Sequence, residues 1–216
     1  MNVASAKGRL VTLEGGEGAG KSTVLEAVRA RLASHGLDVV VTREPGGTDL
    51  GESVRALVLD PARRELCAES ELLLMFAARA QLVRERIQPA LAQGRWVLSD
   101  RYTDASYAYQ GGGRGQPQER IAGLERWAAP VVPDLTLLLD LPVAVGLARA
   151  GARGEADRIE RENGDFFERV RAAYRARAAA EPARFRVLDA SRAVDEVRTA
   201  ACAEIERFVA TSGAVQ

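Results

Sequence analysis

The chain has 216 residues, of which 47% are hydrophobic and 28% are charged, the mixture of a soluble globular protein with one domain-sized core. Thirty lysines and arginines balance 30 aspartates and glutamates, so the net charge gives no reason to expect nucleic acid or a membrane surface as a partner. A single histidine, His35, excludes a His-rich metal site, and the separated Cys67 and Cys202 indicate two free thiols in a reducing compartment.

Short apolar runs alternate with longer helical patterns along the chain. The runs predict buried strands over residues 9–14, 38–42, 96–100, 135–140 and 185–189, because they are short and rich in Val and Leu. Helices are expected over residues 21–34, 51–59, 70–92, 103–109, 117–128, 142–151 and 194–209. This alternation predicts an α/β fold in which helices cover both faces of a parallel five-stranded sheet.

Two segments carry little apolar content. The glycine-rich stretch over residues 109–117 is expected to be a loop, and residues 149–163 are either a solvated helix-loop or a mobile, arginine-rich lid. No apolar run approaches the roughly 18 residues of a membrane span, and residues 1–10 lack the apolar segment of a signal peptide. We therefore expect one cytoplasmic domain over residues 1–216, with no membrane partner.

The first predicted helix follows a stretch that fits the pattern GxxxxGK[ST]. Glycines in such a loop let successive backbone N–H groups surround a phosphate, and the following helix adds its positive end. The lysine would reach the β- and γ-phosphates of a nucleoside triphosphate, and the next hydroxyl would ligate Mg²⁺. The alternative is an ordinary glycine-rich turn. The expected ligand-binding residues are Gly15, Gly16, Glu17, Gly18, Ala19, Gly20, Lys21, Ser22 and Thr23.

An Asp-Arg pair ends the third predicted strand, at the carboxyl edge where α/β sheets bind ligands. There Arg101 could hold a second phosphate and Asp100 could help to hold Mg²⁺, although a structural salt bridge is the alternative. The chain has no NKxD-type motif of GTPases, and it is shorter than most motor or transport ATPases. This combination favours a kinase that acts on a small acceptor.

Six blocks of the sequence resemble thymidylate kinases, in the order and spacing of that family and over roughly residues 8–209. The blocks are EGGEGAGKST, TREPGGT, LLMFAARAQ, DRYTDASYAYQGGGRG, PDLTLLLDLP and RGEADRIE. The chain is most similar to the bacterial branch, which carries its arginines in the lid. The resemblance implies a P-loop NTPase-type fold and transfer of the γ-phosphoryl group of ATP to dTMP with Mg²⁺, giving dTDP and ADP for dTTP synthesis. It also implies a homodimer, with the 70–92 helix as a candidate interface.

The resemblance assigns roles around the acceptor. Glu17 would lie near the sugar, Tyr109 near the deoxyribose, and Arg79 and Arg101 on the acceptor phosphate. The sequence departs from the family at Met75, where a phenylalanine often stacks on thymine, so either Met75 or Phe76 would pack on the base. Other residues implied to line or bind the acceptor are Arg43, Glu44, Pro45, Ser106 and Gln110.

The lid would supply three arginines, Arg149, Arg153 and Arg158. An arginine aimed at a transferred γ-phosphoryl group contributes about 10³–10⁵-fold in rate, whereas the alternative is a solvated charged helix. A kinase for another nucleoside monophosphate, such as dUMP, dGMP or CMP, and a non-catalytic nucleotide-binding protein remain open as alternatives.

Overall fold

A computed structural model describes residues 8–151 and 155–213, and it contains the predicted five-stranded parallel sheet. The strands lie in the order β2-β3-β1-β4-β5, so the strand before the glycine-rich loop is central. The strand bounds agree with the predicted ones to within one residue: β1 (Leu10–Gly15), β2 (Val39–Arg43), β3 (Trp96–Asp100), β4 (Leu135–Asp140) and β5 (Phe185–Asp189).

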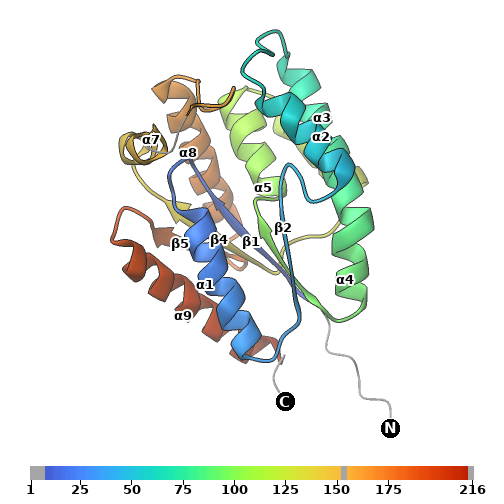
Figure 1. Ribbon diagram of the computed structural model, residues 1–216, viewed down its shortest axis with the longest axis vertical. Coiled ribbons are helices and arrows are strands. Elements are labelled where there is room, and N and C mark those ends of the chain that lie inside the picture. Colours follow the sequence, from blue (N-terminus) through green and yellow to red (C-terminus); the bar gives the residue numbers. More distant parts are fainter. Residues whose placement is uncertain (1–7, 152–154, 214–216) are drawn as a thin grey trace.

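Helices cover both faces of the sheet, as Figure 1 shows. One face packs against α1 (Lys21–Ser34) and α9 (Val194–Ser212), whose buried residues share a core with alternate residues of β1, β3 and β4. The other face packs against α5 (Thr103–Ser106), α8 (Gly164–Ala180) and the helical segment that precedes β3. The α/β prediction is therefore confirmed.

The long helix predicted over residues 70–92 is continuous but not uniform. It consists of α3 (Ala68–Leu82), a π-helical turn over Val83–Ile87, and α4 (Gln88–Ala92). Pro89 lies just after the π-helical turn. Proline lacks an N–H and crowds the preceding turn, and a wider turn before it accommodates both effects.

The predicted 109–117 loop is wrong in its first half. A π-helix over Tyr107–Gly113 follows α5 directly. The glycines allow this packing: a Cβ on Gly113 would approach Phe166 Cε2 of α8 to 2.4 Å. The segment is thus a buried helix against α8 rather than a surface loop.

Helix α8 was absent from the sequence prediction. Its buried residues, Phe166, Phe167, Val170, Tyr174 and Ala178, recur at helical spacing, but arginines and glutamates between them hide the pattern. The Asn163 side chain caps the helix by accepting a hydrogen bond from the Phe166 N–H at 2.9 Å.

The remaining helices are α2 (Asp49–Leu59), α6 (Gln118–Ala128) and α7 (Val143–Gly151). The Thr48 side chain caps α2 by accepting from the Gly51 N–H at 3.0 Å. Within residues 8–151 and 155–213, no helix combines the length and apolar character needed to cross a membrane.

Candidate active site

The glycine-rich loop between β1 and α1 is shaped as an anion-binding loop. Gly18 has a positive φ of 66°, and a Cβ there would lie 2.0 Å from the Gly146 carbonyl oxygen of α7. The N-cap of α1 is Gly20, and no side chain in the described part of the chain caps the helix. Its first-turn N–H groups therefore remain available to a phosphate.

Lys21 lies folded against this loop. Its Nζ donates to the carbonyl oxygens of Gly15 at 3.1 Å and Gly16 at 3.0 Å. Burial, together with the positive charge of Arg101, lowers the pKa of Lys21 to about 8. A polyphosphate bound in this loop would place negative charge next to the buried ammonium group.

The lowered pKa of Lys21 predicts an alkaline loss of activity. Above about pH 8 the free enzyme carries a neutral amine at this position, so kcat/KM for ATP should fall with a break near pH 8. Lys21→Arg keeps the positive charge at all these pH values and should remove that break, even where its absolute rate is lower. A pH series of kcat/KM on both proteins tests this, and the same break in both would contradict it.

Asp100 and Ser22 are the predicted metal ligands. The Asp100 Oδ1 atom is buried and has no hydrogen-bond partner among the described residues. Ser22 lies exposed at the start of α1, one residue after Lys21. A carboxylate oxygen at the end of β3 without a partner in the described chain and a hydroxyl at the start of α1 fit Mg²⁺, which takes one or two protein oxygens and completes its shell with phosphates and water.

Arg101 links this loop to the second half of the site. Its φ of 68° is unusual for a non-glycine residue, and two bonds hold the backbone there: its N–H donates to Leu13 O at 2.9 Å, and its carbonyl accepts from Ser99 Oγ at 2.6 Å. The guanidinium donates to Gly15 O and to Tyr174 Oη, at 3.0 and 3.1 Å.

The guanidinium of Arg101 also donates to Glu17 Oε1 at 3.0 Å, and the Tyr109 hydroxyl donates to the same oxygen at 2.7 Å. The predicted neighbours Glu17, Arg101 and Tyr109 are therefore brought together.

A cavity of about 110 Å³ lies beside these three residues. Seven of the predicted acceptor residues line it: Glu17, Glu44, Pro45, Met75, Arg101, Tyr109 and Gln110. Met75, rather than Phe76, faces this cavity, whereas Phe76 packs with Leu72, Tyr107 and Ile121 toward α6.

Arg79 lies in a buried network of hydrogen bonds. Its side chain is fully buried, and it donates to Glu44 Oε2 at 2.7 Å, Ser106 Oγ at 3.0 Å and Tyr102 O at 3.1 Å. It therefore lies behind the cavity wall, where it contacts Glu44 and Ser106, and its predicted contact with the acceptor phosphate stays a prediction. Ser106, which accepts a hydrogen bond from Arg79, does not line the cavity either.

Arg43 also lies outside the cavity, in a surface pair with Glu52 at 2.8 Å. It ends β2 with an exposed side chain directed toward the start of α2. The prediction that Arg43 lines the acceptor pocket is therefore not what this structure shows.

The lid arginines separate into three cases. Arg149, on α7, donates to the carbonyl oxygens of Ala190 at 2.8 Å and Ser191 at 3.2 Å. Arg153 lies outside the described residues. Arg158 is partly buried and donates to Val58 O at 2.7 Å and to Glu71, so it links the end of the predicted lid to α2 and α3. In this structure Arg158 is thus engaged in contacts with α2 and α3, and both its predicted role at the transferred phosphoryl group and the mobility of the lid stay predictions.

Sequence reasoning missed three residues at these sites. Arg55 and Asp157 line the acceptor cavity, and Tyr174 lines a smaller cavity beneath the glycine-rich loop. Arg55 adjoins the buried Val54 on α2, and its NH1 donates to Pro45 O at 3.2 Å. The sequence signal that could have identified Arg55 is its position beside the apolar face of the short helix predicted over residues 51–59.

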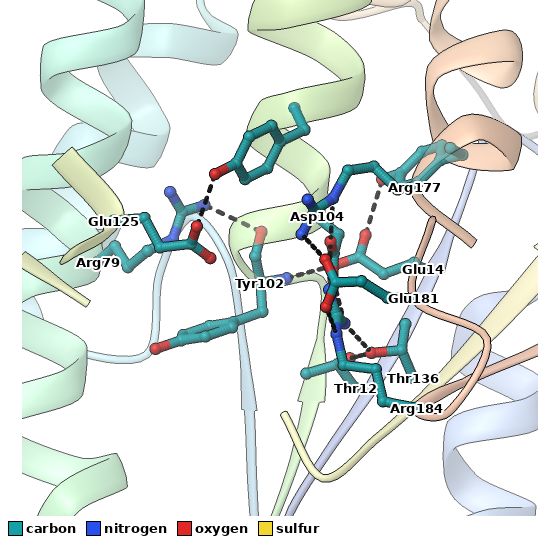
Figure 2. A network of polar contacts seen from close by, with 12 residues as sticks. Thr12, Glu14, Arg79, Tyr102, Asp104, Glu125, Thr136, Arg177, Glu181 and Arg184 are labelled. Atoms are coloured by element: carbon teal, nitrogen blue, oxygen red, sulfur yellow. Dashed lines mark hydrogen bonds and ion pairs between the residues drawn. The ribbon is translucent and has the colours of Figure 1, made fainter. Parts of the chain in front are cut away.

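A buried polar network, drawn in Figure 2, joins β1, α5 and α8. Asp104 accepts from Arg177 at 3.0 Å and from both terminal nitrogens of Arg184, the shorter at 2.7 Å. Glu14 Oε1 accepts from the Tyr102 N–H at 2.7 Å, so the end of β1 is tied to the residue after Arg101. Burial, with the nearby charge of Asp104, raises the pKa of Glu14 to about 8.

The Arg101–Glu17 pair connects the phosphate-binding loop to the neighbouring cavity. This arrangement defines a P-loop phosphotransferase of the kind that joins two bound phosphorylated molecules. Comparisons with known proteins agree. The chain matches the model of the thymidylate kinase family over residues 13–201. It is 58% identical over 192 residues to the thymidylate kinase of Pseudomonas putida, covering 88% of this chain and 91% of that protein.

Two more relatives extend the comparison. The thymidylate kinase of Pseudomonas syringae pv. tomato is 55% identical over 192 residues, covering 88% of this chain and 91% of that protein. A crystal structure of thymidylate kinase from Ehrlichia chaffeensis has a TM-score of 0.76 and 30% identity, covering 93% of this chain and 99% of that one. The chain belongs to the thymidylate kinase family and is an ATP-dependent kinase.

Proposed function

We infer that this chain transfers the γ-phosphoryl group of ATP to dTMP, giving dTDP and ADP, as a step in dTTP synthesis. The observation that carries this inference is the Arg101–Glu17 pair, which connects the phosphate-binding loop to the acceptor cavity. A side chain in that position can contact both the donor and the acceptor, and bringing two anions together is the main task in phosphoryl transfer.

Charge neutralisation accounts for the proposed roles in the transfer step. Lys21 and the free N–H groups of α1 would bind the donor phosphates, and Arg101 would hold the acceptor phosphate in line. The acceptor phosphate is itself an anionic nucleophile, so no general base is needed. Ser22 and Asp100 would hold Mg²⁺, which neutralises charge on the β- and γ-phosphates when bound.

The acceptor cavity supports a deoxynucleotide with a small base. The Tyr109 hydroxyl and the Glu17 carboxylate contact each other on its wall, where a sugar lying near them would be crowded at its 2′ position. Met75, Pro45 and Ala105 supply an apolar surface for the base. We propose that Met75 takes the place of the aromatic residue that stacks on thymine in related enzymes.

A steady-state assay of ADP release with ATP, Mg²⁺ and a panel of monophosphates tests this function. We expect dTMP to give the highest kcat/KM, ahead of dUMP, dGMP and CMP. A higher value for another monophosphate would overturn the acceptor assignment and leave the P-loop chemistry intact. Binding of ATP without turnover of any monophosphate would support a nucleotide-binding protein instead.

We further propose that the enzyme acts in the cytoplasm as a homodimer. The two cysteines are unpaired, in keeping with a reducing compartment. An apolar groove between α3 and α6 carries the exposed Leu73 and Trp127, with Trp127 83% exposed. A second copy of this chain is the proposed occupant, because large exposed aromatic residues typically anchor interfaces.

The dimer proposal predicts the effect of one substitution. Trp127→Glu should weaken self-association by at least about 30-fold, since a buried tryptophan anchor is worth about 2 kcal/mol or more. Sedimentation velocity over a concentration series measures this, with Leu50→Glu on α2, another exposed apolar residue, as the control. A monomeric wild-type protein, or equal effects of both substitutions, would contradict the proposed interface.

A further inference from the structure

Gln110 has a buried amide of which only one half is satisfied. Its side chain is 1% exposed and lines the acceptor cavity. The Nε2 atom donates to Glu71 Oε1 at 2.9 Å, whereas Oε1 of Gln110 is buried without a hydrogen-bond partner among the described residues. An unpaired buried carbonyl oxygen is costly, so its position beside a ligand cavity points to a donor on the ligand.

Glu71 is held as an acceptor-only carboxylate. It is 1% exposed, on α3, and Arg114 Nε and Arg158 NH2 both donate to it. Burial alone would raise its pKa, but the hydrogen bonds from Gln110 and Arg158 and the charge of Arg114 prevail and lower the pKa. An ionised carboxylate cannot donate a hydrogen bond, so only the NH₂ side of the Gln110 amide can face it.

This arrangement determines which way the amide points. A flip of the Gln110 amide would place its carbonyl oxygen against the Glu71 carboxylate, with two acceptors in contact and a buried NH₂ group facing the cavity. Such a flip removes a charge-assisted bond and adds repulsion in a buried site. The cavity is therefore presented with a carbonyl oxygen, an acceptor, at this position.

We propose that Glu71 is a specificity-determining positioning residue: by fixing the Gln110 amide, it selects acceptor bases that carry a ring N–H donor and rejects bases that present a ring-nitrogen acceptor there. Thymine and uracil carry an N3–H donor, whereas the N3 atom of cytosine is an acceptor. This inference rests on the proposed function, since it assumes that the base of the monophosphate lies at Gln110.

The matched variants Glu71→Gln and Glu69→Gln test the proposal. A glutamine at position 71 can offer either its oxygen or its nitrogen, so the Gln110 amide can turn to donate to cytosine. The ratio of kcat/KM for dTMP to that for dCMP should fall about 10- to 100-fold in Glu71→Gln. The ratio should stay unchanged in Glu69→Gln. Glu69 lies on α3, as Glu71 does, but its carboxylate accepts from Gln116 and not from Gln110.

The ratio separates the possible outcomes. A purely structural role of Glu71 would lower kcat/KM for both monophosphates alike and leave the ratio unchanged, which would overturn the proposal. If the wild-type protein itself shows no preference for dTMP over dCMP, the proposed function fails first. A wild-type preference that Glu71→Gln preserves would contradict only the role of Glu71.

A second measurement uses the wild-type protein and does not depend on the variant folding. In a ¹⁵N-glutamine-labelled sample, the side-chain NH₂ group of Gln110 should exchange slowly with solvent in the free enzyme and in the enzyme with dTMP bound. The signal is assigned by its loss in Gln110→Leu. Rapid exchange in the free enzyme would show that the amide is not fixed before the base arrives, and would overturn the proposal.

Discussion

Replacing Lys21 by methionine should lower kcat by about 10²–10³-fold or more, because it removes one preorganised positive donor from the site of developing phosphate charge. The variant should remain folded. The Nζ atom donates to the loop carbonyls of Gly15 and Gly16, and its lowered pKa means that folding gains nothing from burying the ammonium. Single-turnover kinetics and thermal unfolding measure the two effects separately.

The matched control for this substitution is Arg29→Met on the same helix. Arg29 is exposed and pairs with Glu26 three residues earlier, so its loss should leave kcat unchanged. If Lys21→Met retained wild-type turnover and merely bound ATP more weakly, Lys21 would serve ground-state binding alone, and the role assigned to it in transfer would be wrong.

Replacing Asp104 by alanine should lower the free energy of unfolding by about 1–3 kcal/mol, the usual cost of leaving buried hydrogen-bond donors without their acceptor. Asp104 is fully buried, and its carboxylate is paired with Arg177 and Arg184. Both arginines keep an ion pair with Glu181 at 2.6 Å, and Arg184 also donates to Thr136 Oγ1 at 2.8 Å, so neither charge is left without a partner. Urea unfolding monitored by circular dichroism measures the change.

Glu26→Ala is the control for the stability measurement, because the Glu26–Arg29 pair is exposed and such pairs contribute about 0–1 kcal/mol. A loss below about 1 kcal/mol in Asp104→Ala would contradict the view that the network in Figure 2 holds α5 and α8 in place.

The phosphate-binding loop could be predicted because its information is local. Glycines, one lysine and one hydroxyl follow a buried strand and precede a helix, and the structure places Lys21 against Gly15 and Gly16. The strands could be predicted for the same reason, since each is a short run rich in apolar residues. The predicted burial holds for the inner strands β1, β3 and β4, whereas the edge strands β2 and β5 are partly exposed.

The roles of the arginines could not be predicted in the same way. Arg79 shares a helix face with Met75, yet its longer side chain passes behind the cavity to Glu44, which comes from another segment of the chain. In the sequence, Arg158 is one of several charged residues in a polar segment. The fold brings it to Glu71 on α3. The partner of a buried charge depends on tertiary contacts that spacing along the chain does not encode.

The choice between Met75 and Phe76 depended on the phase of one helix. Neighbouring residues on a helix differ by about 100° in direction, so a small error in phase exchanges their environments. The structure directs Met75 into the cavity and Phe76 toward α6. Helix α8 was missed for a related reason, since its apolar residues are separated by charged ones that face solvent.

A competition experiment tests the transfer of phosphate from ATP to dTMP. The protein is mixed with Mg²⁺, ATP labelled with ³²P at the γ position, and equal concentrations of dTMP, dUMP, dGMP and CMP, and the labelled products are separated. If the chain phosphorylates dTMP, the label appears mainly in the β-phosphate of dTDP, in step with ADP formation. Label found mainly in inorganic phosphate, or in the diphosphate of another nucleoside, would contradict it.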